Sequence, residues 1–395
     1  MLCIIFSDSF NFQMAEAISD EPRPVYSMNI QEAAETGQLE EVRYWYRKNR
    51  RSIFRGQDSV CSTPLYKAAF YGHIDIVKYL WKQSRIFIDI KEKRRRRLNQ
   101  NCSNQFESLQ KVKMNFPKNS ESNVNDDLGF PLGAAAERGY LNIVEFLVNN
   151  GCHLEQREGW NKTALHLATI HNHKKIVKCL LEQGANVNCK DVHGKTPLFY
   201  ATSDGFLPIM KLLIMAKADI NIKSLFTKET ALAWAIRDGS YEQIKILLDA
   251  GSDINNKSCE GKNVLFDAIR CSVEVVELLI NREIDVNCID DYSGQTALYD
   301  AIMLEKLDIV KLLIESGANV NHIDINNHSL FHYAAINNKI ECAKMLLENG
   351  AVVQINNQNL DYSNPNEAIR NYLKSLPRNS ENGSSVKPYT TKQNS

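Results

Sequence analysis

The fold of this chain is decided by a stretch that reads Thr163-Ala-Leu-His-Leu-Ala168 and continues as Ile176-Val-Lys-Cys-Leu-Leu-Glu-Gln-Gly-Ala-Asn-Val-Asn188. The pattern returns as Thr196-Pro-Leu-Phe-Tyr-Ala201 before Ile209-Met-Lys-Leu-Leu213, and as Thr296-Ala-Leu-Tyr-Asp-Ala301 before Ile309-Val-Lys-Leu-Leu-Ile-Glu-Ser-Gly-Ala-Asn-Val-Asn321. The third residue of the motif falls at Leu65, Leu132, Leu165, Leu198, Leu232, Leu265, Leu298 and Phe331. With an earlier copy near Ile30, the chain holds nine copies of a unit of about 33 residues.

Each unit is predicted to be two helices joined by a turn. Thr196 is a good helix N-cap, and Pro197 suits the first helical position. Leu198 and Ala201 are three residues apart and share one face of that helix. The second helix carries a broad apolar stripe, and Gly317 ends it in a later copy. One unit cannot bury its stripe alone, so neighbouring units must supply each other's core.

The repeated motif and its spacing resemble those of the ankyrin repeat family over roughly residues 29–355. The resemblance implies an all-α ankyrin-repeat α-solenoid of about nine helix-turn-helix repeats with short β-hairpin-like turns. We expect two repeats in 28–84 and seven in 127–356. Lys217 and Glu283 stand where other copies have glycine. The helix–helix turn at Cys271-Ser272 is short, and Asn263-Val264 replaces Thr-Pro. From these departures we expect residues 262–290 to be less regular than 160–220.

The remaining segments are assigned from composition. We expect 1–27 to be a disordered or strap-like N-terminus, with Met14 as a second possible start, and 377–395 to be a disordered tail. Residues 357–376 are predicted to form a C-terminal capping helix. For 85–126 we favour a basic, mostly flexible insertion over a degenerate tenth repeat, because it lacks the Leu-x-x-Ala core.

A basic cluster lies inside this insertion. Residues 85–118 hold ten Lys/Arg and three Asp/Glu, a net charge of +7. The cluster has the form of a nuclear-import signal or an acidic-partner patch, and the simpler interpretation is a solvated loop. Its residues are Lys91, Lys93, Arg94, Arg95, Arg96 and Arg97.

Composition and the lack of known catalytic motifs argue against several classes of protein. The chain has 47 Lys+Arg and 47 Asp+Glu, so nucleic-acid binding is not expected to dominate. We expect no membrane span and read the ten cysteines as reduced thiols of a cytoplasmic or nuclear protein. P-loop, dinucleotide, nucleophile-elbow and zincin motifs are missing from the sequence, so we predict neither an enzyme, a cofactor nor a metal. His166, His171 and His173 are given structural roles.

Partner-binding residues are predicted on the first helix of each unit. The residue two after the motif Leu is rotated about 200° from it on a helix of 3.6 residues per turn. The resemblance to ankyrin repeat proteins implies that the residues two and five positions after the motif Leu line a concave groove. The candidates are Leu167, Ile170, Tyr200, Trp234, Arg237, Asp267, Asp300 and Tyr333. Aromatic anchors followed by Asp267 and Asp300 suggest a ligand with a basic segment. Turn tips are further candidates: Lys190, His193, Phe226, Lys257, Tyr292 and Asn326.

The leading hypothesis is a monomeric, non-enzymatic protein-interaction scaffold or adaptor that binds a protein or extended peptide. One alternative is the substrate-recognition subunit of a cullin-RING ubiquitin ligase, because the order of repeats and insertion loosely resembles the Fem-type receptors. A second alternative is a nuclear regulatory protein that uses Lys91–Arg97.

Overall fold

The computed structural model describes residues 29–48, 63–85 and 130–352. The chain divides into two compact units, Met1–Gly129 and Phe130–Ser395. The described part of the first unit contains α1 (Ile30–Thr36), α2 (Leu39–Lys48), α3 (Pro64–Phe70) and a helix over 74–85. These four helices make two helix pairs.

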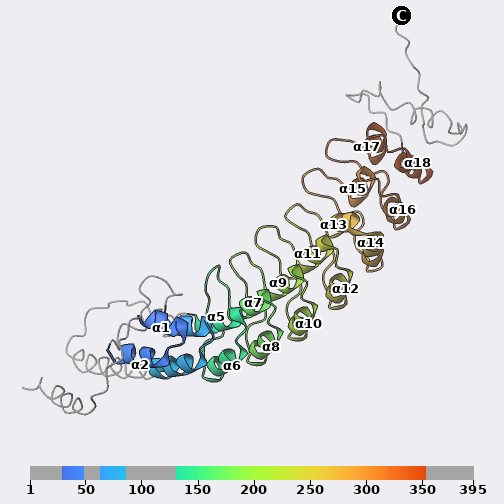
Figure 1. Cartoon of the computed structure of the whole chain (residues 1–395). Coiled ribbons are helices and arrows are strands. Elements are labelled where there is room, and N and C mark those ends of the chain that lie inside the picture. The colour runs from blue at the N-terminus through green and yellow to red at the C-terminus, as the bar shows by residue number, and fades with distance from the viewer. Residues whose placement is uncertain (1–28, 49–62, 86–129, 353–395) are drawn as a thin grey trace, which may run out of the picture. The chain divides into compact units, whose positions relative to one another are not determined.

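The described part of the second unit, residues 130–352, is a stack of seven helix pairs (Figure 1). Its helices are α5 (Pro131–Arg138), α6 (Leu141–Asn149), α7 (Ala164–Ile170), α8 (Lys174–Glu182), α9 (Pro197–Ser203), α10 (Leu207–Met215), α11 (Ala231–Asp238), α12 (Tyr241–Asp249), α13 (Leu265–Cys271), α14 (Val273–Ile280), α15 (Ala297–Met303), α16 (Leu307–Glu315), α17 (Leu330–Ile336) and α18 (Ile340–Glu348). Hairpin loops, odd-numbered helices and even-numbered helices form three successive rows in Figure 1. The predicted all-α solenoid of nine repeats is confirmed over the described residues.

The pair α9–α10 shows why this sequence folds as it does. Thr196 caps α9 by accepting a hydrogen bond from the Phe199 amide at 3.4 Å, and proline occupies the first turn. Ala201 is fully buried, and its small side chain allows neighbouring helices to approach closely. Ile209 and Leu213 of α10 are also fully buried and face the same core. Stacking therefore buries the apolar stripe that one pair alone would expose.

A ladder of side-chain amides ties successive repeats together after each second helix. The Asn188 Oδ1 accepts from the Asp219 amide at 2.8 Å, and the Asn221 Oδ1 accepts from the Asp253 amide at 2.9 Å. Asn255, Asn287 and Asn321 make the same bond to the next repeat. The second Asn of the Asn-Val-Asn motif thus accepts a hydrogen bond from a backbone amide one repeat away.

The sequence departures have local consequences. Lys217 and Glu283 adopt left-handed φ values of 61° and 63°, which confirms that they occupy the positions that prefer glycine. Such a conformation costs about 1 kcal/mol for a residue with a Cβ. Ser272 alone separates α13 from α14; it is extended and caps α14 by accepting from the Val275 amide. The pair within 262–290 is therefore joined more tightly than its neighbours.

Buried aspartates build several of the hairpins. Asp191 Oδ1 accepts from the amides of His193 at 2.8 Å and Lys195 at 2.9 Å. Asp324 does the same in the last described hairpin. Isolated antiparallel bridges join residues 158 and 162, 289 and 296, and 323 and 329, which matches the expected hairpin-like turns. Each hairpin is therefore a rigid loop with its own internal hydrogen bonds.

Several predictions fall outside the described residues. They concern 1–27, nearly all of the 85–126 insertion with its cluster Lys91–Arg97, the capping helix at 357–376 and the tail at 377–395. None of the described helices is long and apolar enough to cross a membrane.

Candidate protein-interaction surface

The predicted groove residues lie on the odd-numbered helices of the second unit. Leu167 and Ile170 are on α7, Tyr200 is on α9, Trp234 and Arg237 are on α11, Asp267 is on α13, Asp300 is on α15, and Tyr333 is on α17. Arg237 is exposed and the other seven are half-buried. Their side chains are therefore partly engaged in the stack and partly open to a partner.

The two tyrosines are held by the hairpins. The Tyr200 hydroxyl donates to Asp191 Oδ2 at 2.6 Å, and the Tyr333 hydroxyl donates to Asp324 Oδ2 at 2.6 Å. Burial and the neighbouring carboxylate raise the pKa of the Tyr200 hydroxyl above its usual value. Each tyrosine hydroxyl thus ties its hairpin to an odd-numbered helix and is already engaged within the chain.

Aromatic rings and cations gather beside α9 and α11. The Phe199 and Trp234 rings meet edge to face with centroids 5.4 Å apart. Lys195 Nζ lies 4.8 Å from the Phe199 centroid, 5.9 Å from that of Tyr200 and 5.0 Å from that of Trp234. The Arg237 guanidinium lies 5.4 Å from the Trp234 centroid. Phe199 is buried, so the part of this cluster that a partner can reach is an amphipathic ridge of Tyr200, Trp234, Lys195 and Arg237. Such a surface is typical of those that anchor protein partners.

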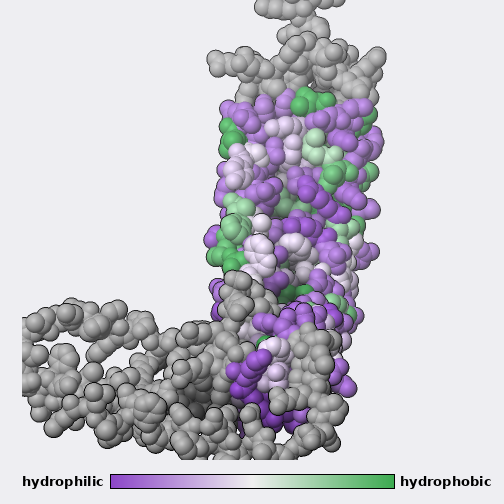
Figure 2. All heavy atoms as spheres, turned by 60° about the vertical axis from the view of Figure 1, so that its left-hand side comes forward, coloured by the Kyte–Doolittle hydropathy of each residue, from purple (hydrophilic) through white to green (hydrophobic). Residues whose placement is uncertain are grey.

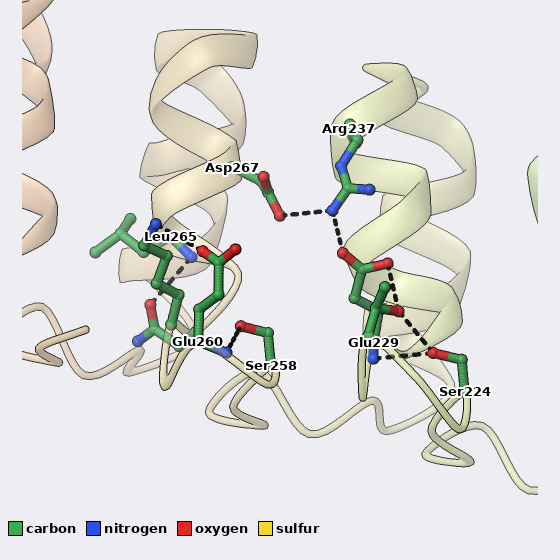
Figure 3. A network of polar contacts seen from close by, with 10 residues as sticks. Ser224, Glu229, Arg237, Ser258, Glu260, Leu265 and Asp267 are labelled. Carbon is green, nitrogen blue, oxygen red and sulfur yellow. Dashed lines mark hydrogen bonds and ion pairs between the residues drawn. The ribbon is translucent and has the colours of Figure 1, made fainter. Parts of the chain in front are cut away.

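A charged pocket adjoins the ridge. Arg237 bridges Glu229, through a short hydrogen bond, and Asp267, at 3.6 Å (Figure 3). Lys262 pairs with Glu260 at 2.8 Å. The pocket has a volume of about 270 Å³. The Arg237 guanidinium donates a hydrogen bond to the Glu229 carboxylate, which raises the pKa of Arg237, so this guanidinium stays in its charged form.

The positive and negative side chains that line the pocket are equal in number. The lining as a whole therefore does not favour the basic ligand that the sequence suggests. The pocket lining includes four cations and four anions: Lys228, Arg237, Lys262, Arg270, Glu229, Glu260, Asp267 and Asp300. The Asp267 carboxylate is already paired with Arg237, whereas the Asp300 carboxylate has neither a hydrogen bond nor an ion pair within the described residues. Burial raises the pKa of both carboxyl groups. Asp300 is thus the better of the two candidates for a basic group of a ligand.

The histidines have the structural roles expected of them. His166 Nε2 lies 3.2 Å from the Lys195 carbonyl oxygen of the next repeat, and His173 Nε2 lies 2.9 Å from that of Glu137. His171 stacks on His173 with centroids 6.3 Å apart. Within the described residues, no group of three His, Cys, Asp or Glu is placed to hold a metal ion.

Sequence reasoning missed part of the hairpin surface. Trp160 is 68% exposed at a hairpin tip and stacks on His193 with centroids 5.7 Å apart. The signal that finds it is the repeat itself, because Trp160 stands 33 residues before His193, which was predicted as a tip. Cys259 and Ile325 occupy the same position in later hairpins and are also exposed.

Comparisons with known proteins identify the family. A sequence model of ankyrin repeats in three copies matches residues 98–191, 132–224, 223–290 and 283–359, and a model of many copies matches residues 30–80. The chain therefore belongs to the ankyrin repeat family. Ankyrin repeats are generally protein–protein interaction scaffolds and are typically non-enzymatic.

One solved structure agrees with this assignment, and a second is reported beside it. The ankyrin repeat domain of Bcl-3, described as a unique member of the IkappaB protein family, is 28% identical; the match covers 54% of this chain and 97% of that chain, with a TM-score of 0.50. The human ASB11 ankyrin repeat domain is 26% identical over 57% of this chain and 99% of that chain, with a TM-score of 0.46. A search of curated proteins finds no match to this chain.

Proposed function

We propose that this chain is a non-enzymatic scaffold that binds a partner protein or extended peptide through the odd-numbered helices and hairpins of residues 130–352. The observation that supports this most is the pair of half-buried rings Tyr200 and Trp234. Lys195 lies beside both rings and Arg237 lies beside Trp234, next to a pocket of about 270 Å³. Half-buried aromatic rings beside cations are typical anchors of protein interfaces.

The test is a capture experiment with a matched control. The variant Trp234→Ala with Arg237→Ala removes one ring and one cation from the ridge. The control, Met215→Ala with Lys211→Ala, removes one large apolar side chain and one cation from α10, where Met215 is 79% exposed. Immobilised full chain is incubated with cell lysate, and the bound proteins are quantified by mass spectrometry.

We expect the ridge variant to lose partners that the wild type and the control retain, while all three proteins keep the same helical circular dichroism. Equal capture by both variants would contradict binding through the ridge. Nothing in the described residues favours either the cullin-ligase receptor or the nuclear regulator, so both stay predictions. Co-purification with elongins or a cullin tests the first, and neutralising Arg94–Arg97 tests the second.

A further inference from the structure

An apolar row runs along the tips of the hairpins at one fixed repeat position. Its members are Trp160, His193, Phe226, Cys259, Tyr292 and Ile325, each 33 residues after the one before. Trp160, Phe226, Tyr292 and Ile325 are 68%, 73%, 70% and 68% exposed. Single exposed apolar residues are normal on protein surfaces. This hairpin-tip row is different because four of these six loops carry a large exposed apolar or aromatic side chain at the same place, and the other two carry His193 and Cys259.

The row stands out from its surroundings. In the view of Figure 2 most of the described surface is hydrophilic, and hydrophobic residues form separate patches. Val192 and Leu225, next to two of the tips, are 41% and 53% exposed and extend the apolar area there. Four of the six tips therefore expose a large apolar or aromatic side chain to water.

Backbone hydrogen bonds hold neighbouring tips in register. The Val192 amide donates to the Trp160 carbonyl at 3.0 Å, and the Leu225 amide donates to the His193 carbonyl at 2.9 Å. The ring centroids of Trp160 and His193 are 5.7 Å apart, and those of His193 and Phe226 are 6.1 Å apart. A pre-ordered surface of this kind loses little conformational entropy when a ligand binds.

The charge around the tips changes along the row. Around the first four tips, residues 157–162, 190–195, 223–229 and 257–262 contain eight Lys or Arg and four Asp or Glu. Around the last two tips, residues 290–295 and 323–328 contain three Asp and no Lys or Arg. The first four tips are thus set in a positive surface and the last two in a negative one.

Most of the acids near the first four tips are already engaged. The Asp191 carboxylate is buried and bonded within its hairpin, Glu229 pairs with Arg237, and Glu260 pairs with Lys262. Seven of the eight cations take part in no ion pair with a described residue: Arg157, Lys162, Lys190, Lys195, Lys223, Lys228 and Lys257. This excess positive charge is available to an acidic ligand.

We propose that the tips at 160, 193, 226 and 259 bind an extended acidic segment of a partner protein that presents large apolar side chains at alternate positions. The inference rests on the proposed scaffold function and names the chemistry of the partner. Alternate side chains of an extended chain lie on one face about 6.6 Å apart. That spacing is close to the 5.7 Å and 6.1 Å between successive rings of the row.

The experiment uses the full chain and synthetic probes. A fluorescein-labelled peptide of about 12 residues that alternates glutamate with leucine is long enough to cross several tips. The comparison probes are a peptide with the same residues in two blocks, a lysine–leucine alternating peptide and a single-stranded oligo(dT) of similar length. Fluorescence anisotropy gives the affinity of each probe at low and high salt.

Two variants have matched controls. Phe226→Ala is compared with Tyr292→Ala, which removes an equally exposed ring from the acidic end of the same row. Lys190→Glu with Lys228→Glu is compared with Lys175→Glu and Lys245→Glu, which change the net charge equally on exposed lysines of α8 and α12. All four variants remove exposed side chains, so we expect each of them to fold.

The alternating acidic peptide should bind best, with an affinity that falls as salt rises. We expect Phe226→Ala and the Lys190/Lys228 reversal each to weaken binding by about tenfold, and their controls to change it by less than about twofold. Equal binding of the lysine–leucine peptide, tighter binding of oligo(dT), or an equal loss with Tyr292→Ala would each overturn the proposal. Because these readouts do not involve the Trp234 ridge, their failure leaves the capture test of the scaffold function intact.

Discussion

Protonation of one buried histidine should destabilise the array at mildly acidic pH. His166 is fully buried on α7, and its Nδ1 lies 3.2 Å from the Thr163 amide nitrogen. That amide can only donate, so Nδ1 accepts and the proton sits on Nε2, which donates to the Lys195 carbonyl at 3.2 Å. A second proton on Nδ1 would face the Thr163 N–H and break the helix cap. Burial, moreover, lowers the pKa of His166 to about 4.

The size of the effect follows from linkage. An unfolded histidine has a pKa near 6.5. Between the two pKa values the unfolded chain binds the extra proton and the folded chain does not, so stability is full above about pH 6.5 and falls as the pH is lowered. From about pH 8 to about pH 5, this one group removes about 2 kcal/mol from the free energy of unfolding.

The assay is urea unfolding of the full chain, followed by helical circular dichroism near pH 8 and pH 5. His166→Gln is the matched variant, because glutamine keeps an acceptor at the third helical position and cannot take up a proton. Wild type and variant share every other titrating group, so the difference between their pH dependences isolates His166. Identical losses in the two proteins, or an NMR titration of the His166 ring near its ordinary pKa, would refute the reasoning.

Three further substitutions test the contacts that hold the stack, each read out by urea unfolding. Asn221→Ala removes the acceptor of the Asp253 amide and should cost about 1 kcal/mol, whereas Asn221→Asp keeps an acceptor and should recover most of it. Leu213→Ala opens a cavity at a fully buried site of α10 and should cost about 2–5 kcal/mol; a loss below that range would mean that the neighbouring repeats close the space. Tyr200→Phe breaks the 2.6 Å bond to the buried Asp191 carboxylate and should cost about 1.5–3 kcal/mol, and no change would show that the carboxylate is satisfied by its backbone donors alone.

The repeat pattern was sufficient to predict the fold, because the residues that begin, orient and end each helix are close together in the sequence. Thr196 and Pro197 begin a helix, Leu198 and Ala201 share its face, and glycine or a left-handed Lys217 marks the end of the following helix. These preferences depend on residues within four positions of one another. Because every unit has the same helix pair and presents the same apolar stripe to the next unit, the repeated units pack into a stack.

The sequence predicted which helices carry the candidate residues but not which of their side chains are already paired. Helical rotation placed Tyr200, Trp234 and Asp267 on the odd-numbered helices correctly, since that geometry is also local. It did not reveal that Asp267 is neutralised by Arg237 or that the Tyr200 hydroxyl is taken by Asp191. These pairings depend on how a hairpin folds back onto a helix, which the spacing of residues does not specify.

The sequence by itself determined the architecture of this protein, because a 33-residue period of helix signals and apolar stripes has one way to bury its surface. Only the tertiary structure decided which side chains remain for a partner. Trp160 and Phe226 reach solvent, and Glu229 near Phe226 is paired with Arg237. Hydrogen bonds between hairpins 33 residues apart fix where each loop points. Contacts between residues 33 positions apart form only when the repeats stack, so the sequence of a single repeat does not predict them.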